Sequence, residues 1–162
     1  MSRFQQIRNR APLANEGCAL VVACPAMKSN VNISMIARSA SCLGANNLII
    51  TGQNRITTHI SRDCSIPIEH RNSLMPIVQK HKQEGYRIIG LEQATNSQNI
   101  YEYEFVNSPT MLIVGNECRG MDEDVLNALD DVIEIPLFGA PHSLNVAVAT
   151  SLCLFEFAKQ MR

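Results

Sequence analysis

Apolar runs and segments of helical period alternate along the chain. Five short apolar runs predict strands buried on both faces: "CALVVACPA" (18–26), "NNLIITG" (46–52), "RIIGLE" (87–92), "MLIVG" (111–115) and "VIEIP" (132–136). Segments with helical spacing lie between and after them, at residues 29–45, 73–86, 122–130 and 143–160. The alternation predicts an α/β fold with a mostly parallel sheet and helices on both of its faces.

The helix boundaries and one aperiodic stretch refine this picture. Pro76 falls in the first turn of 73–86, where proline is tolerated, and Ser143 is the expected N-cap of the last helix. That last segment, 143–160, is apolar nearly all round, which predicts burial on most sides. Residues 53–72 lack periodicity and predict an irregular excursion.

Length and composition predict one ordinary globular domain. The 162 residues suit a single core, with residues 1–17 as a short N-terminal extension and 18–162 as the domain. No stretch approaches the roughly 20 apolar residues of a membrane span, and the polar start of the chain lacks the apolar core of a signal peptide. We therefore expect a cytoplasmic protein.

The cysteines predict neither a disulfide framework nor a metal site. The six of them form no CxxC pair and no Cys/His spacing suited to zinc. A further group, His59, Asp63, Cys64 and His70, has irregular spacing and is typical of a surface loop. We expect free thiols and no bound metal.

Overall charge gives no indication of a polyanionic partner. The net charge is −1 and the sequence pI about 6.4, so RNA would have to be bound by a local basic patch. Scattered solvated charge is an equally good interpretation of each candidate, namely Arg3, Arg8, Arg10, Arg55, Arg62, Arg71, Lys80 and Lys82.

Polar residues stand out where strands lead into helices, the usual place for ligands in open α/β sheets. Asn116 and Glu117 follow the run at 111–115, and Asn145 lies in an apolar segment. A buried amide or carboxylate needs partners or costs a few kcal/mol, so these groups are expected to satisfy one another around a pocket. Asn32 and Arg38 would lie about 120° apart on one helix, and could converge only if Asn32 belongs to the entering loop.

Several familiar sites are excluded by their missing motifs. The chain has no GxGxxG after its first strand and no GxxxxGK[ST], which argues against a Rossmann dehydrogenase or a P-loop enzyme. His142 and Ser143 are adjacent, but a nucleophile and base pair also needs an orienting group and an oxyanion site.

Three stretches together resemble the SpoU (TrmH-like) branch of the SPOUT RNA methyltransferases. They occur in family order as "NVNISMIARSASCLGANNLIITG", "MLIVGNECRGMDEDVLNALDDVIEIPLFG" and "HSLNVAVATSLCLFEF", and the resemblance runs from about residue 18 to 160. The stretch "GYRIIGLEQATNS" is similar to the subgroup that modifies a guanosine ribose in the tRNA D-loop. Ser34 and Cys118 depart from the common family pattern without removing a catalytic side chain.

The resemblance implies a deep trefoil knot at the C-terminal end, a rare exception to the rule against threaded chains. It also implies a homodimer and S-adenosylmethionine bound by backbone groups of the loops 91–94, 116–120 and 135–145. The cofactor-binding residues expected from it are Leu91, Glu92, Gly115, Asn116, Gly120, Ile135, Pro136, Leu144 and Asn145.

The resemblance implies 2'-O-methylation of RNA, with a tRNA guanosine as the first candidate substrate. The alternatives are methylation of ribosomal RNA and a non-catalytic RNA-binding role. Arg38 is then the central catalytic residue; Asn32 positions it and the RNA backbone, while Glu117, Ser143 and Asn145 hold the loops and the ribose. Because a guanidinium pKa exceeds about 12, we favour an orienting role for Arg38 and leave a role as the base open.

Overall fold

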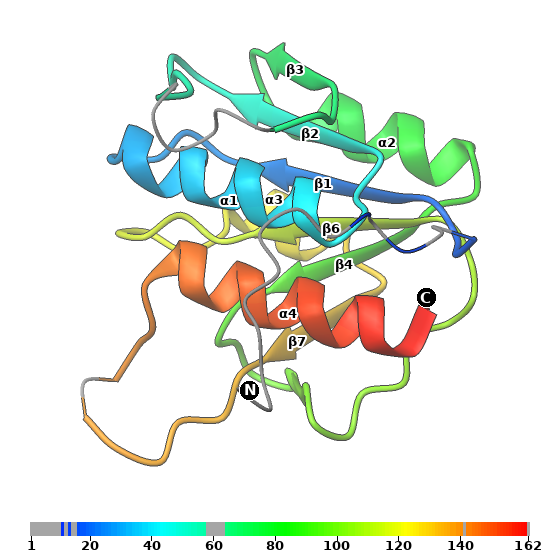
Figure 1. Cartoon of the computed structure of the whole chain (residues 1–162). Coiled ribbons are helices and arrows are strands. Elements are labelled where there is room, and N and C mark those ends of the chain that lie inside the picture. The colour runs from blue at the N-terminus through cyan, green and yellow to red at the C-terminus, as the bar shows by residue number, and fades with distance from the viewer. Residues whose placement is uncertain (1–10, 12, 14–15, 58–63, 141, 162) are drawn as a thin grey trace, which may run out of the picture.

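The structure, a computed structural model, describes residues 11, 13, 16–57, 64–140 and 142–161. Its centre is a sheet in the order β3-β2-β1-β6-β4-β7-β5 (Figure 1), in which every pairing between these strands is parallel. The strands are β1 (Leu20–Cys24), β2 (Asn47–Thr51), β3 (Ile68–Arg71), β4 (Arg87–Leu91), β5 (Gln98–Asn99), β6 (Thr110–Val114) and β7 (Asp131–Glu134).

Helices cover both faces of the sheet, as the sequence predicted. The helices α1 (Asn30–Cys42) and α4 (Val146–Met161) lie on one face, and α2 (Met75–Gln83) and α3 (Glu123–Leu126) on the other (Figure 1). Alternate residues of β1 supply the two cores: Leu20, Val22 and Cys24 pack with α1 and α4, and Val21 and Ala23 pack with α2 and α3. A strand buried on both faces has no polar side, which explains its uninterrupted apolar run.

The sheet has a reversal of strand order at its centre. The neighbouring strands β1 and β6 pair from Leu20↔Thr110 to Ala23↔Ile113. The chain leaves β1 toward α1 on one face and leaves β6 toward α3 on the other. Connections that diverge in this way open a crevice beyond the carboxyl ends of the two strands, where open α/β sheets bind ligands.

Two strands escaped the sequence prediction. The stretch 53–72 is not irregular throughout, because Ile68–Arg71 forms the edge strand β3 against β2. Only one side of an edge strand is paired, so it can be short and carry exposed polar residues such as His70 and Arg71. The two-residue β5 is too short to give any periodic signal.

The predicted cap of the last helix is wrong. The helix α4 begins at Val146, two positions later than a cap at Ser143 implies, and Asn145 rather than Ser143 accepts hydrogen bonds from its first turn. The short helix is also shorter than predicted, since the chain after α3 turns back so that Asp130 can bond the backbone of Ile88. Pro76 lies in the first turn of α2, as predicted.

The last helix is buried or half-buried at most positions, as predicted, but one side of it is exposed and largely apolar. Along α4, Val148, Leu152 and Phe155 are 42%, 46% and 59% exposed. On the adjacent α1, Val31 and Met35 are 48% and 40% exposed. We call these five side chains the outer apolar face. It explains why the sequence of α4 looks buried all round: its outward stripe is apolar, although the described residues leave it exposed.

Three of the basic residues named as candidates for a patch form ion pairs with acidic side chains. Arg71 pairs with Glu69, Lys80 with Glu84 and Lys82 with Asp130, which neutralises three of them locally. Those at positions 3, 8, 10 and 62, together with His59 and Asp63 of the suggested loop group, lie outside the described residues.

The described residues offer neither a membrane-spanning helix nor a metal site. None of the helices described has the length and apolar character needed to cross a bilayer. In the same part of the chain, no three His, Cys, Asp or Glu side chains gather in a way that could hold a metal ion. All six cysteines lie within the described ranges and form no disulfide. The predicted knot and the division at residue 18 remain predictions.

Candidate functional site

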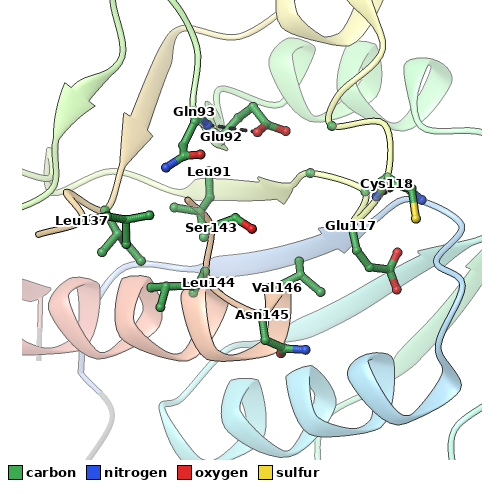
Figure 2. Close-up of a pocket in the computed structure, with 15 residues that line it drawn as sticks. Leu91, Glu92, Gln93, Glu117, Cys118, Leu137, Ser143, Leu144, Asn145 and Val146 are labelled. Carbon is green, nitrogen blue, oxygen red and sulfur yellow. Dashed lines mark hydrogen bonds between the residues drawn. The ribbon is translucent and has the colours of Figure 1, made fainter. Parts of the chain in front are cut away.

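A pocket of about 430 Å³ lies at the carboxyl ends of β4, β6 and β7 (Figure 2). Three loops that follow these strands form its walls, and the first turn of α4 closes one side. Its volume is within the range of small-molecule sites in proteins. The lining residues are Leu91, Glu92, Gln93, Gly115, Asn116, Glu117, Cys118, Gly120, Ile135, Leu137, Ser143, Leu144, Asn145, Val146 and Ala149.

Glu117 joins the loop after β6 to the loop after β1. Its Oε1 accepts hydrogen bonds from the backbone N–H of Ser29 and from Asn32 Nδ2, both 3.2 Å long. Its Oε2 accepts one from the backbone N–H of Lys28, also 3.2 Å long. The carboxylate thus bridges the reversal of strand order between β1 and β6, where two chain segments diverge.

Asn32 extends this link to the third segment. Its Oδ1 accepts a hydrogen bond of 3.1 Å from Asn145 Nδ2, while Asn145 Oδ1 accepts from the N–H groups of Ala147 and Val148. Asn145 therefore caps α4 with one end of its amide and holds α1 with the other. Residues 32, 117 and 145 form one chain of hydrogen bonds across all three motifs, which we call the Asn–Glu–Asn chain.

The hydrogen bonds also set the charge state of Glu117. Burial acts to raise the pKa of its carboxyl, but the bonds from its own N–H, from Lys28 and Ser29 and from Asn32 outweigh that effect and hold the pKa below its usual value. Glu117 is therefore ionised at neutral pH. A carboxylate with a lowered pKa and several donors already bound is a poor proton acceptor, which favours a role in positioning.

Asn116 fixes the shape of the loop that carries Glu117. Its side-chain Nδ2 donates to Ala26 O at 2.6 Å, and its Oδ1 accepts from the N–H groups of Cys118 and Arg119 at 2.8 and 3.0 Å. Its backbone forms a two-way bridge with Gly120, whose φ of 70° lies in the region that favours glycine. The loop is thus closed by its own hydrogen bonds.

Gly115 and Gly120 leave room for the side chain of Glu92. A Cβ added to Gly115 would overlap Glu92 Oε2, and one added to Gly120 would approach that oxygen to 2.9 Å. The half-buried carboxylate therefore lies directly on the backbone of both glycines. Gly115 and Gly120 were expected from the resemblance to bind the cofactor, and in the structure the Glu92 carboxylate lies against both of them.

Most of the predicted site residues meet at the pocket. Its lining contains Glu117, Ser143 and the predicted cofactor residues except Pro136, whose neighbours Ile135 and Leu137 line it instead. Asn32 stands behind the wall, 9% exposed, in contact with Glu117 and Asn145.

Arg38 is placed apart from this group. Both Asn32 and Arg38 lie within α1, so the condition for their convergence, Asn32 in the entering loop, is not met. Asn32 faces inward, whereas Arg38 is exposed on the outward stripe that also holds Val31 and Met35. The side-chain hydrogen bonds given for Asn32 run to Glu117 and Asn145, and its positioning of Arg38 stays a prediction.

Sequence reasoning missed the backbone groups that complete the site. The N–H groups of Lys28 and Ser29 hold Glu117, and no side-chain pattern announces a backbone donor. Asn54 orders that loop by accepting from Met27 N–H at 2.7 Å and donating to Met27 O at 2.9 Å. Asn54 is 8% exposed in the structure, but it lies in the stretch without periodicity, so the sequence gives no sign that its side chain is buried.

The fold and pocket together define an α/β protein that binds a small ligand at the carboxyl edge of a parallel sheet. Residues 19–155 match the sequence profile of the SpoU rRNA Methylase family. The chain belongs to this family.

Individual relatives agree with that assignment. The chain is 28% identical over 147 residues to a tRNA (guanosine(18)-2'-O)-methyltransferase of Aquifex aeolicus, covering 87% of this chain and 69% of that one. It is 28% identical over 158 residues to the tRNA (guanosine(18)-2'-O)-methyltransferase TARBP1 of Mus musculus, covering 93% of this chain but 10% of the mouse protein. Against several further curated relatives it spans about half of their length.

Solved structures show the same fold. The crystal structure of the A. aeolicus TrmH/SpoU tRNA modifying enzyme superposes with a TM-score of 0.80 at 28% identity, over 87% of this chain and 74% of that one. The SpoU methyltransferase AviRb from Streptomyces viridochromogenes, in complex with AdoMet, gives a TM-score of 0.74 at 26% identity, over 92% and 60%. These superpositions confirm the predicted parallel α/β architecture.

Proposed function

We propose that this protein transfers a methyl group from S-adenosylmethionine to a ribose 2'-hydroxyl of RNA. The first candidate substrate is a guanosine of tRNA. The observation that carries the proposal is the Asn–Glu–Asn chain, which joins all three family motifs beside one pocket. The tRNA guanosine methyltransferases among the relatives support the substrate, and the AdoMet complex of AviRb supports the cofactor.

The pocket suits S-adenosylmethionine in size and in chemistry. One part is apolar, with Leu91, Ile135, Leu137 and Leu144 able to cover a purine ring. The other part holds Glu117 and Asn145, and Gly115 and Gly120 leave backbone exposed between them. The residues named as cofactor-binding from the sequence would hold the group there.

When bound, S-adenosylmethionine supplies an electrophilic methyl carbon on a positively charged sulfur. The chain's task is to hold a ribose oxygen in line with that carbon while the hydroxyl proton leaves. Ionised Glu117, itself held by three donors, fixes the loop 116–120, and Asn145 fixes the start of α4. Ser143, exposed on the pocket wall, offers a hydroxyl that can donate to the ribose or accept from it.

The proposal places Arg38 in the site of a second protomer. Arg38 shares the outward side of α1 with Val31 and Met35, which belong to the outer apolar face. Pairing of two such faces would remove exposed apolar surface from water and bring the guanidinium of one chain toward the partner's pocket. There it would bind an RNA phosphate and orient the ribose. A homodimer is therefore part of the proposal, as is a cytoplasmic location.

Ribosomal RNA is the second candidate substrate. The family to which the chain belongs is described by rRNA methylation, and the fold does not distinguish the two RNAs. A non-catalytic RNA-binding role is less well supported, because the intact Asn–Glu–Asn chain has a clear use in positioning reactants and none in simple binding.

One experiment separates these possibilities. Purified protein is incubated with donor carrying a labelled methyl group and with tRNA or ribosomal RNA, and the nucleosides are then separated by mass spectrometry. We expect label in 2'-O-methylguanosine from tRNA. Label only from ribosomal RNA would favour the second candidate, and binding of RNA without any labelled nucleoside would favour the non-catalytic role.

A further inference from the structure

Glu92 is a pocket residue whose carboxylate has an unusual setting. It follows β4 directly, and its backbone N–H donates to Ile133 O at 3.1 Å, so its position at the edge of the sheet is fixed. Its Oε1 accepts a hydrogen bond from the Gln93 N–H at 3.0 Å. In the described part of the chain, Oε2, which lies against Gly115 and Gly120, accepts none.

The two glycines keep this oxygen at the pocket wall. Any side chain at position 115 would displace Oε2, and one at position 120 would crowd it. Both glycines and Glu92 line the pocket, so the carboxylate presents an acceptor to whatever occupies that space. A carboxylate pairs best with strong donors, namely hydroxyl or ammonium groups.

The position of Glu92 within the pocket indicates which donor it meets. Figure 2 shows its carboxylate at the top of the view beside Gln93, with Leu137 and Leu144 lower on one side and Glu117 and Cys118 lower on the other. In an adenosyl donor the ribose likewise lies between the purine and the sulfur that carries the methyl group. An acidic residue after a parallel strand that accepts from ribose hydroxyls is also the solution that dinucleotide-binding α/β proteins use.

We propose that the Glu92 carboxylate binds the ribose hydroxyls of the methyl donor, and so determines specificity for a ribonucleoside. This inference rests on the proposed function, since it assumes an adenosyl ligand in the pocket. It assigns to the Glu92 side chain a role distinct from the backbone contacts expected of the loop 91–94.

The test measures binding and needs no RNA. Isothermal titration compares S-adenosylhomocysteine with its 2'-deoxy and 3'-deoxy analogues and with 5'-methylthioadenosine, which lacks the amino acid. Native protein and Glu92→Gln are titrated in parallel. We expect Glu92→Gln to weaken binding of S-adenosylhomocysteine about tenfold or more, which corresponds to the loss of a hydrogen bond to a charged group. The same substitution should have little effect on the affinity for at least one deoxy analogue.

The probes distinguish the possible outcomes. If Glu92→Gln loses affinity for 5'-methylthioadenosine by the same factor as for the parent ligand, the result supports a contact of Glu92 with the ribose. A loss of affinity confined to ligands that carry the amino acid would overturn the proposal in favour of a contact with the α-ammonium group. Equal losses for the parent and both deoxy analogues would also overturn it. If native protein fails to bind S-adenosylhomocysteine at all, the proposed function itself fails, whereas binding that is indifferent to Glu92 defeats this inference alone.

A second variant covers the case in which Glu92→Gln folds poorly. Glu92→Asp keeps the charge but withdraws the carboxylate by one methylene from the glycines, and circular dichroism checks that both variants are folded. We expect Glu92→Asp to lose discrimination between the parent and the deoxy ligand. Retained discrimination in folded Glu92→Asp and Glu92→Gln proteins would contradict the assignment.

Discussion

Asn32 of α1 donates a hydrogen bond of 3.2 Å to Glu117 Oε1, although 85 residues separate them in the chain. The same asparagine accepts from Asn145 through its Oδ1. The Asn32 side-chain amide thus donates to Glu117 of the second family motif and accepts from Asn145 of the third. This geometry brings three motifs that are far apart in sequence together beside one pocket, and it makes Asn32 the residue whose loss should separate them.

Substitution Asn32→Ala tests that relationship. It removes a donor from Glu117 and an acceptor from Asn145, two exposed residues at which water can replace the lost partner, so each hydrogen bond lost costs about 0.5–1.5 kcal/mol of stability. We expect lower donor affinity in titration and loss of methyl transfer. Asn47→Ala is the matched control, since Asn47 also donates to a carboxylate, that of Glu69, on the edge strand away from the pocket. Equal effects of the two substitutions on donor affinity would contradict the role given to Asn32.

Substitution by alanine should cost much more stability at Gly52 than at Gly115. At Gly115 the new methyl group meets the flexible end of Glu92, which can move aside. At Gly52, with φ of 78°, it meets Ala26 Cβ at 2.6 Å, and neither the backbone nor that methyl group can yield. We expect Gly52→Ala to lower the free energy of unfolding by about 1–3 kcal/mol and Gly115→Ala to lower it much less.

Urea unfolding of both variants measures this difference. Gly115→Ala should nevertheless weaken binding of S-adenosylhomocysteine, because the displaced carboxylate or the methyl group itself intrudes on the pocket. A Gly115→Ala protein as unstable as Gly52→Ala would show that Glu92 is held rigidly, contrary to the account given above.

The lowered pKa of Glu117 predicts a dependence of stability on pH. The Glu117 carboxyl binds its proton less tightly in the native state than in the unfolded state. The ionised carboxylate therefore stabilises the fold above the pKa of the unfolded state, about 4.3, and this stabilisation is lost as pH falls through the lower pKa of the native state. Unfolding of native protein and Glu117→Gln is followed from pH 7 to about pH 3. The advantage of the native protein should shrink as the solution is acidified.

A control and a contradictory outcome belong to this series. Glu102→Gln removes an exposed carboxylate outside the pocket and corrects for the change in total charge. A difference between native protein and Glu117→Gln that stays constant or grows toward low pH would show that the hydrogen bonds to Glu117 do not stabilise its ionised form.

The cysteines provide a chemical probe of the pocket. Burial raises the pKa of the Cys153 thiol to about 12, and burial with the nearby charge of Glu117 also raises that of Cys24, so both should resist alkylation. Cys118 is exposed and lines the pocket. We expect S-adenosylhomocysteine to slow its reaction with iodoacetamide, as read by peptide mass spectrometry, and to leave exposed Cys42 unaffected. Protection of both cysteines, or of neither, would argue against a ligand at this site.

The outer apolar face predicts self-association. Leu152→Glu puts a charge at its centre and should convert a dimer into a monomer in sedimentation analysis, while methyl transfer is lost because Arg38 no longer reaches a partner's pocket. Val106→Glu is a matched control, since Val106 is 49% exposed against 46% for Leu152 but lies on neither helix. A native protein that sediments as an active monomer would remove Arg38 of a second chain from the mechanism.

The sequence predicted the interior of the fold better than its borders. Strands such as β1 and β6 are buried on both faces, so apolar runs alone locate them. The edge strand β3 carries Glu69, His70 and Arg71 and pairs on one side, which leaves no such run. In α4 the apolar outward stripe was mistaken for burial, because a sequence cannot show whether an apolar surface is covered by its own chain or left open.

The candidate site likewise has residues that the sequence predicted and contacts that it did not. Glu117 and Asn145 were found because polar groups beside buried segments need partners, and the structure supplies those partners. The partners of Glu117 in the loop after β1 are backbone N–H groups, which carry no residue signature. The position of Arg38 depended on whether α1 already included Asn32, and boundaries of this kind are set by capping contacts such as that of Ser29 with the Asn32 N–H.

The decisive measurement is methyl transfer from labelled donor to unmodified tRNA by the purified protein, with nuclease digestion and mass spectrometry identifying the product. We expect label in a 2'-O-methylated nucleoside, and loss of that label in Asn32→Ala and Arg38→Ala proteins that remain folded. Label on a base, or undiminished ribose labelling by both variants, would contradict it.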